Sequence, residues 1–229
     1  MKLRDHTMKL SDSTLTILKN FAGINNSILV KKGNQLRTIS VAKNILAEAQ
    51  IVEEFSRDFA IYDLNQFLNV NTTLFHAPEL DFTNDGYVII REGTSRQTFF
   101  FADPNVIVTP PDKEITLPSE DVSFKLSTEQ LDKLLKAAAI NQLPDFSAVG
   151  ADGKVKLVVR DKKNDTTNDF SIVVGETESE FTFNFKVENI KILPGTYDVV
   201  VSQKLLSRFS SNSHNLTYYI ALEPDSTFE

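Results

Sequence analysis

Residues 10–25 read LSDSTLTILKNFAGIN, and residues 126–141 read LSTEQLDKLLKAAAIN. Aligned without a gap, the two stretches are identical at Leu10/Leu126, Ser11/Ser127, Leu15/Leu131, Leu18/Leu134, Ala22/Ala138, Ile24/Ile140 and Asn25/Asn141. Both place leucines at helical spacing after a serine that is suited to cap a helix, and Ser127 with Gln130 has the pattern of a capping box. Each stretch is therefore predicted to be an amphipathic helix. Two such helices also share leucine positions by chance, so this match alone does not establish a repeat.

Two further landmarks recur in the same order along the chain. The sequence FAIYDLNQFL at residues 59–68 is typical of a strand that runs into a short helix, and its counterpart is FKVENIKIL at residues 185–193. Each half then ends in an aromatic strand closed by an acidic residue and a proline, FFFADP at 99–104 and YIALEP at 219–224. Three landmarks at spacings between 116 and 126 residues indicate that a whole domain is duplicated.

The segments between these landmarks are predicted to form antiparallel strands. Residues 86–90 and 98–102 flank a short turn, and residues 154–160 and 169–174 flank the polar turn DKKNDTTN, so each pair is predicted to be a hairpin. In residues 181–187, Phe and Val alternate with polar residues, which is the period of a half-buried strand. The chain is thus predicted to be rich in β-structure with a few helices.

The domain boundaries follow from the prolines and the first residues. The stretch TPPDKEITLPSED carries three prolines and is predicted to be an extended connector over residues 110–120, between domains at 8–109 and 121–229. The opening MKLRDHT is followed at once by MKLSDST, so residues 1–7 are expected to be an extension outside the fold.

Composition narrows the function classes. The chain has no cysteine, which excludes disulfides and thiolate chemistry, and it has no apolar run long enough for a membrane span or a signal peptide. We therefore expect a soluble, intracellular protein with no membrane partner. The net charge of −7 is shared by both halves, so a nucleic-acid function would need lysines gathered on one face.

Motifs of enzyme chemistry are missing from the sequence. His6, His76 and His214 have neither metal-ligand spacing nor a neighbouring nucleophile motif, and no glycine-rich phosphate loop is present. The acidic residues at 53–54 and 176–180 are typical of solvated turns and lack the geometry of a metal site. The chain is predicted not to be an enzyme and to have no metal and no cofactor.

Several separated segments together resemble the sliding clamps of T-even-type phages, which are DNA polymerase processivity factors. In chain order they are MKLSDSTLTILKNFAGIN, FAIYDLNQFL, FFFADPN with the proline-rich connector, LSTEQLDKLLK, FTFNFKVENIKILPGTYDV and ALEPDST. The resemblance runs from Met8 to nearly the last residue and does not cover residues 1–7.

The resemblance implies an α+β clamp fold of two similar domains, each with an antiparallel sheet outside and two helices inside. Six domains would close into a ring around duplex DNA, so the chain is expected to form a homotrimer. Expected partners are duplex DNA, held without regard to sequence, a DNA polymerase and an ATP-dependent clamp loader, in the cytoplasm of an infected bacterial host. The helices implied to line the hole are Ser11–Gly23, Asp63–Val70, Ser127–Ile140 and Glu188–Leu193.

The resemblance also implies two sets of site residues. The side chains expected to face DNA phosphates are Lys19, Lys133, Lys136 and Lys191, with Lys9 and Arg4 as weaker candidates, although lysine is also the usual residue of any solvated helix face. Residues 63–70 carry no basic residue, so the first domain is expected to contribute less.

A pocket for short hydrophobic partner peptides is expected near the connector and the C-terminal end. Its expected residues are Ile115, Leu117, Leu222 and Pro224, each of which would otherwise serve ordinary edge packing. Such a pocket would make the chain a docking platform for the polymerase and for other DNA-acting proteins. The alternative is a structural or assembly protein of a phage, built from a duplicated β-rich domain and without a function on DNA.

Overall fold

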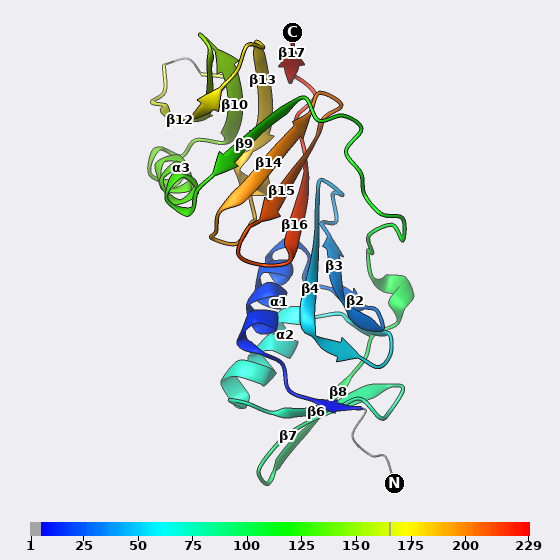
Figure 1. The fold of residues 1–229 in the computed structure, drawn as a ribbon. Helices are drawn as coiled ribbons and strands as arrows, with labels where there is room; N and C mark the ends of the chain where they lie inside the picture. Colours follow the sequence, from blue (N-terminus) through cyan, green and yellow to red (C-terminus); the bar gives the residue numbers. More distant parts are fainter. Residues whose placement is uncertain (1–5, 165) are drawn as a thin grey trace. The chain divides into compact units, whose positions relative to one another are not determined.

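The computed structural model describes residues 6–164 and 166–229, and it divides into two compact units between Asp112 and Lys113 (Figure 1). This division lies inside the proline-rich segment 110–120 that was expected to connect two domains. Among the described residues, no helix is both long and apolar enough to cross a membrane.

The first unit contains two α-helices, one π-helix, one 3₁₀ turn and eight strands among its described residues. Its elements are β1 (Thr7–Met8), α1 (Asp12–Ile24), β2 (Ile28–Val30), β3 (Gly33–Ile39), β4 (Ile45–Phe55), β5 (Phe59–Ile61), α2 (Leu64–Asn69), the π-helix η1 (Val70–Leu74), β6 (Glu79–Asp81), β7 (Tyr87–Glu92), β8 (Ser95–Phe100) and the 3₁₀ turn η2 (Pro104–Val106). The strands β1, β6, β7 and β8 pair in that order, while β2 pairs with β5 and β3 with β4, all antiparallel.

The second unit contains one α-helix and nine strands among its described residues. Its elements are β9 (Val122–Leu126), α3 (Thr128–Asn141), β10 (Asp145–Ala151), β11 (Lys154–Arg160), β12 (Phe170–Glu176), β13 (Phe181–Lys186), the 3₁₀ turn η3 (Val187–Asn189), β14 (Tyr197–Ser202), β15 (Leu206–Ser211), β16 (Leu216–Ala221) and β17 (Thr227–Phe228). Both predicted hairpins and the predicted alternating strand are present, as β7–β8, β11–β12 and β13.

The two units repeat one topology. In the second unit, β9, β14, β15 and β16 pair in the same order as β1, β6, β7 and β8 in the first. The pairs β10–β13 and β11–β12 likewise correspond to β2–β5 and β3–β4. Helix α1 packs on β3 and β4, and helix α3 packs on the equivalent strands β11 and β12. The duplication predicted from three sequence landmarks is therefore confirmed at the level of the fold.

The helix starts are set by local sequence. Ser127 Oγ accepts from the Gln130 N–H (3.2 Å), and the Gln130 side chain accepts from the Ser127 N–H (2.9 Å), which is the predicted capping box. Ser11 caps α1 by accepting from the Thr14 N–H (3.3 Å). Buried apolar side chains on one face then hold each helix against its sheet, with Ile17, Leu18 and Phe21 on α1 and Leu131, Leu134 and Ala138 on α3.

The fourth expected helix, Glu188–Leu193, is absent, and this prediction was wrong. Only η3 is helical there, and the chain then continues without a helix to Pro194. The backbone of Leu193 is held by two buried tyrosines, because its N–H donates to the Tyr218 hydroxyl (3.1 Å) and its carbonyl accepts from the Tyr197 hydroxyl (2.6 Å). A proline also disfavours helical geometry at the residue before it. The proline and these hydrogen bonds together account for the absence of the expected helix.

The start of the chain also differs from the expectation. Thr7 belongs to β1, where it pairs with Asp81, and His6 Nδ1 lies 3.1 Å from Ser56 Oγ. Residues 6 and 7 are therefore part of the first unit rather than an extension outside it. The remainder of the expected extension, residues 1–5, lies outside the described residues, and so does Arg4.

Candidate nucleic-acid interface

The outward face of α1 carries one lysine. Its buried face includes Leu18 and Phe21, whereas Asp12, Thr16 and Lys19 are exposed at helical spacing. Lys19 forms no ion pair or hydrogen bond with any other described residue. The Lys19 ammonium group therefore lies in solvent, on the helix face that was expected to face DNA.

The outward face of α3 carries two lysines with different surroundings. Lys133 and Lys136 are both exposed, while Leu131 and Leu134 are buried beneath them. Lys136 forms an ion pair with Asp132 one turn earlier, at 2.7 Å, and both groups are largely solvated. Such an exposed pair is worth little in stability, and it lowers the positive charge that the Lys136 side chain presents.

The lysines of the two helices do not occupy equivalent positions of the repeat. With Ser11 aligned to Ser127, the position of Lys19 corresponds to Leu135, and the positions of Lys133 and Lys136 correspond to Ile17 and Asn20. Ile17 is buried, whereas Lys133 is exposed. The positive charges on the two helix faces therefore do not follow the repeat of the domain.

Two of the expected DNA-facing lysines are not on helices. Lys191 is exposed in the segment after η3, where the expected helix is missing. Lys9 is exposed between β1 and the cap of α1, on the side of the unit that carries Glu92. The backbone N–H of Ala77 lowers the pKa of the Glu92 carboxyl, and the positive charge of Lys9 adds to this effect.

A groove lies between the two helices of the first unit, and we call it the α1–α2 groove. It has a volume of about 500 Å³ and is lined by Asp12, Leu15, Thr16 and Lys19 of α1 and by Asn65, Leu68, Asn69, Thr72 and Thr73 of α2 and η1. Of these residues, only Lys19 was predicted from the sequence as a site residue. The polar residues on α2 and η1 carry no charge, so nothing in the sequence indicated that they belong to a site for DNA.

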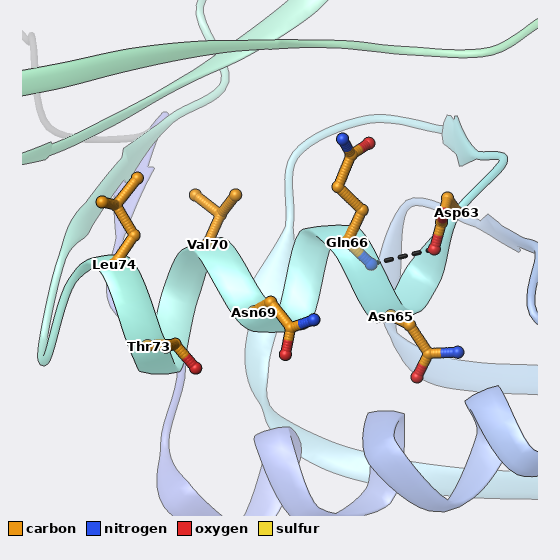
Figure 2. Close-up of a pocket in the computed structure, with 7 residues that line it drawn as sticks. All are labelled: Asp63, Asn65, Gln66, Asn69, Val70, Thr73 and Leu74. Carbon is orange, nitrogen blue, oxygen red and sulfur yellow. Dashed lines mark hydrogen bonds between the residues drawn. The ribbon is translucent and has the colours of Figure 1, made fainter.

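A second hollow, of about 510 Å³, lies on the other flank of α2. It shares Asn65, Asn69 and Thr73 with the α1–α2 groove. Figure 2 shows that these three side chains lie on the side of α2 and η1 nearest the neighbouring helix, while Gln66 and Val70 point the opposite way. Uncharged amide and hydroxyl groups therefore form a ridge along α2 and η1 that borders both hollows.

The equivalent groove of the second unit is smaller and more apolar. It has a volume of about 270 Å³ and is lined by Thr128, Leu131, Asp132, Leu135, Lys136, Ala139, Ile192 and Pro194. Here the segment after η3 takes the place that α2 occupies in the first unit. The loss of the fourth helix thus changes the chemistry of this face.

The charges on the three helices balance. Asp12 opposes Lys19 on α1, and α3 carries two acidic and two basic residues, while α2 carries none. The helices therefore have a net charge of zero, although the whole chain has −7. The excess negative charge lies elsewhere on the chain, which leaves the helix faces the less repulsive surface for a polyanion.

The start of α1 is held by an acid that sequence reasoning did not assign. Glu53 of β4 accepts from the Ser11 N–H and from the Thr14 hydroxyl. Burial raises the pKa of the Glu53 carboxyl, but these hydrogen bonds outweigh burial and bring the pKa below its ordinary value. The carboxylate thus fixes the first turn of α1 and with it the direction of the exposed face.

The expected peptide-pocket residues have different degrees of burial. Ile115 and Leu117 are half-buried in the connector, Leu222 is buried, and Pro224 is exposed. The Leu222 N–H donates to the Leu205 carbonyl (3.0 Å), so Leu222 also has a structural part in its unit. That these four residues form one pocket remains a prediction.

Comparison with known proteins identifies the family of the chain. A family model described as "DNA polymerase processivity factor" matches residues 9–109, and one described as "gp45 sliding clamp, C terminal" matches residues 123–224. The sliding clamp of Escherichia phage RB69 is 34% identical over 97% of this chain and 100% of its own length. The sliding clamp of Vibrio phage KVP40 is 35% identical over 94% of this chain and 99% of its own length.

The fold of the chain is also similar to those of solved sliding clamps. PCNA of A. fulgidus, solved with the C-terminal region of FEN-1 bound, matches with a TM-score of 0.70 at 13% identity and covers 97% of this chain and 99% of that one. At that identity the likeness concerns the fold, and it agrees with the α+β clamp architecture expected from the sequence. Together with the full-length phage relatives, it means that the chain belongs to the family of phage sliding clamps, the DNA polymerase processivity factors.

Proposed function

We propose that three copies of the chain form a ring around duplex DNA and tether the replicative DNA polymerase to its template. The observation that carries this proposal is the repeat of one sheet topology and one helix position in both units of a clamp-family chain. A chain that contributes two similar units closes a six-unit ring with three copies. Cyclic assemblies of this kind use one head-to-tail contact repeated around the ring.

Two open strand edges support the head-to-tail contact. In the first unit, β8 ends its sheet and carries Phe100, which is 71% exposed. In the second unit, β12 ends its sheet and carries Val173, which is 50% exposed. Open edges with exposed apolar side chains promote uncontrolled pairing unless a partner covers them. Pairing of β8 with β12 of the next copy would cover both edges and close the ring.

The weak charge of the helix faces suits a protein that slides. Each phosphate that a lysine or arginine neutralises releases counterions and adds a salt-dependent term to binding. A surface with a few solvated lysines, such as Lys19 and Lys133, attracts DNA without binding it tightly and without regard to sequence. Retention on DNA would then come from the closed ring, and mobility from the shortage of direct ion pairs.

The chain would act as a docking platform without catalysis of its own, in the cytoplasm of the infected host cell. We propose that Ile115, Leu117, Leu222 and Pro224 accept a hydrophobic peptide of the polymerase or of another DNA-acting protein. The A. fulgidus PCNA solved with a C-terminal region of FEN-1 supports this mode of binding for the fold. A closed ring also requires an ATP-dependent loader. A phage assembly protein without a function on DNA is not favoured, because the family is one of processivity factors.

Primer extension with the cognate polymerase and loader tests this proposal. On singly primed circular DNA in the presence of a DNA trap, the protein is expected to shift the products from short to long. A control without the loader is expected to give short products. Unchanged product lengths in the complete reaction would contradict the proposed function.

A further inference from the structure

We propose that the α1–α2 groove binds a backbone phosphate of duplex DNA through Lys19 together with two uncharged donors, Asn69 and Thr73. The proposal rests on the clamp function proposed above and names the ligand of one part of the surface that faces DNA. It assigns a binding role to a helix that carries no basic residue.

Three polar side chains in the groove already donate hydrogen bonds within the protein. The hydroxyls of Thr16 and Thr72 donate to backbone carbonyls one turn earlier, at 2.8 and 2.9 Å. The side-chain amide of Asn65 donates to Asn26 Oδ1 at 2.7 Å. The two hydroxyls thus have no free proton to offer a ligand, and the Asn65 amide has one of its two N–H groups engaged near the C-terminal end of α1.

Three donors in the groove are not used in this way. Lys19, Asn69 and Thr73 form no side-chain hydrogen bond or ion pair with any other residue in the described part of the chain. All three side chains are exposed and line the same groove. The groove therefore presents an ammonium, an amide and a hydroxyl group together to solvent.

The course of the two helices places these donors at one level. The N–H of Leu64 donates to the Asn26 carbonyl (2.8 Å), just after α1 ends, and α2 packs against α1, so α2 runs back along α1. Leu64 and Asn26 lie at the same level, and the two helices run in opposite directions from there. Lys19 is seven residues before Asn26, so it lies at the level reached seven residues after Leu64, which is between Asn69 and Thr73.

The acidic group of the groove lies at its other end. Asp12 is seven residues before Lys19 on α1, about 10 Å along the helix axis. Its carboxylate repels an anion from that end of the groove. The anion is therefore directed to the end with Lys19, Asn69 and Thr73.

The donor set fits a phosphodiester. Its two non-bridging oxygens share one negative charge and accept from an ammonium group and from neutral donors alike. Asn69 and Thr73 would add hydrogen bonds without releasing counterions, whereas Lys19 alone would contribute to the salt dependence. Such a site binds each passing phosphate briefly and in any sequence, as sliding requires.

A salt titration separates these contributions. The assembled protein would be titrated onto a fluorescent linear duplex, whose open ends let rings thread without a loader, at several salt concentrations. Asn69→Ala and Thr73→Val are each expected to weaken binding roughly two- to tenfold at every salt concentration, with an unchanged salt slope. Lys19→Gln is expected to lower the slope by about 0.9 for each lysine engaged. Gln66→Ala, on the opposite flank of α2, is the matched control and is expected to bind like the parent protein.

A second variant at position 69 distinguishes a loss of DNA binding from a loss of folding. Asn69→Asp puts a carboxylate beside the phosphate, so it is expected to weaken binding more than Asn69→Ala at an unchanged melting temperature. Parent-like binding by Asn69→Ala and Asn69→Asp would overturn the groove proposal. That result would leave the clamp function intact if the parent protein lengthens primer-extension products, whereas failure of primer extension would overturn the clamp function itself.

Discussion

The ammonium group of Lys186 lies 2.6 Å from the carboxylate of Asp145, whose side chain is only 1% exposed. The hydrogen bond to Asp145 raises the pKa of Lys186 against the opposing effect of its partial burial. Asp145 also accepts from the Lys162 N–H (3.0 Å), and Lys162 in turn pairs with Asp225 near the C-terminal end (2.7 Å). One buried acid therefore connects β10 with β13 and with the turn after β11.

Asp145→Asn is expected to destabilise the protein. The substitution removes the counter-ion that is hydrogen-bonded to Lys186, and because this lysine is partly exposed and also near Glu223 and Asp225 the cost should be about 2 kcal/mol, below the ~3–5 of a fully buried pair. Urea unfolding of the parent and the variant measures the difference. The matched control is Asp132→Asn, which breaks the exposed pair with Lys136 and is expected to cost less than about 1 kcal/mol. Equal losses in the two variants would show that burial does not set the strength of these pairs.

Glu53→Gln is expected to weaken the start of α1 in a pH-dependent way. The folded-state pKa of Glu53 lies below its unfolded value, so its contribution is present above the unfolded pKa, about 4.3, and is lost as the pH falls through the folded pKa. The variant should lose about 1 kcal/mol at pH 7, and this difference should shrink as the pH drops below about 4. Thermal melts across this range measure it. Glu54→Gln, at an exposed neighbour, is the control, and a constant difference for Glu53→Gln at all pH values would contradict the account.

Replacement of Lys133 and Lys136 by glutamate is expected to reduce retention on DNA without unfolding the protein. Both side chains are exposed, so the melting temperature should stay close to that of the parent. Retention of the loaded protein on circular DNA should fall roughly tenfold at low salt and by less at high salt. Lys163→Glu, at an exposed turn after β11, is the control with one reversed charge. Retention equal to that of the parent would remove both lysines from the DNA-facing set.

Phe100→Asp is expected to weaken assembly. A charge on the open edge of β8 would oppose burial of that edge against another copy. The parent should sediment with about three times the chain mass of 25.7 kDa, and the variant should shift toward 25.7 kDa at micromolar concentration. Val41→Asp replaces a side chain that is 72% exposed in the turn before β4 and should leave the mass unchanged. An unchanged mass for Phe100→Asp would exclude β8 from the contact.

The sequence was sufficient where structure is determined locally. The capping serines, the leucine spacing and the alternation in residues 181–187 act over a few residues, and α1, α3 and β13 are present as predicted. The prediction of a helix at 188–193 was wrong because residues distant in the sequence determine the conformation there. Tyr218, which holds the Leu193 backbone, is 25 residues away in the sequence. The π-helix after α2 depends on side chains such as Asn71, which donates to the Phe67 carbonyl (2.7 Å), and no sequence pattern announced it.

The candidate site was predictable in part for the same reason. Periodicity placed Lys19 and Lys133 on outward helix faces, and both are exposed there. The ion pair of Lys136 with Asp132, one turn earlier on α3, was not predicted and is found only in the structure. Asn69 was missed because an uncharged residue on a helix resembles ordinary surface. Its place in the groove became visible only once α2 was seen beside α1.

Topological retention on DNA tests the central claim most directly. The protein, carrying one engineered cysteine for a fluorescent label because the chain has none of its own, would be loaded onto nicked circular DNA and separated by gel filtration. A closed ring is predicted to co-elute with the circle and to be released when a restriction enzyme linearises it. Protein that stays bound after linearisation, or that never co-elutes with the circle although the loader hydrolyses ATP, would contradict a ring around DNA.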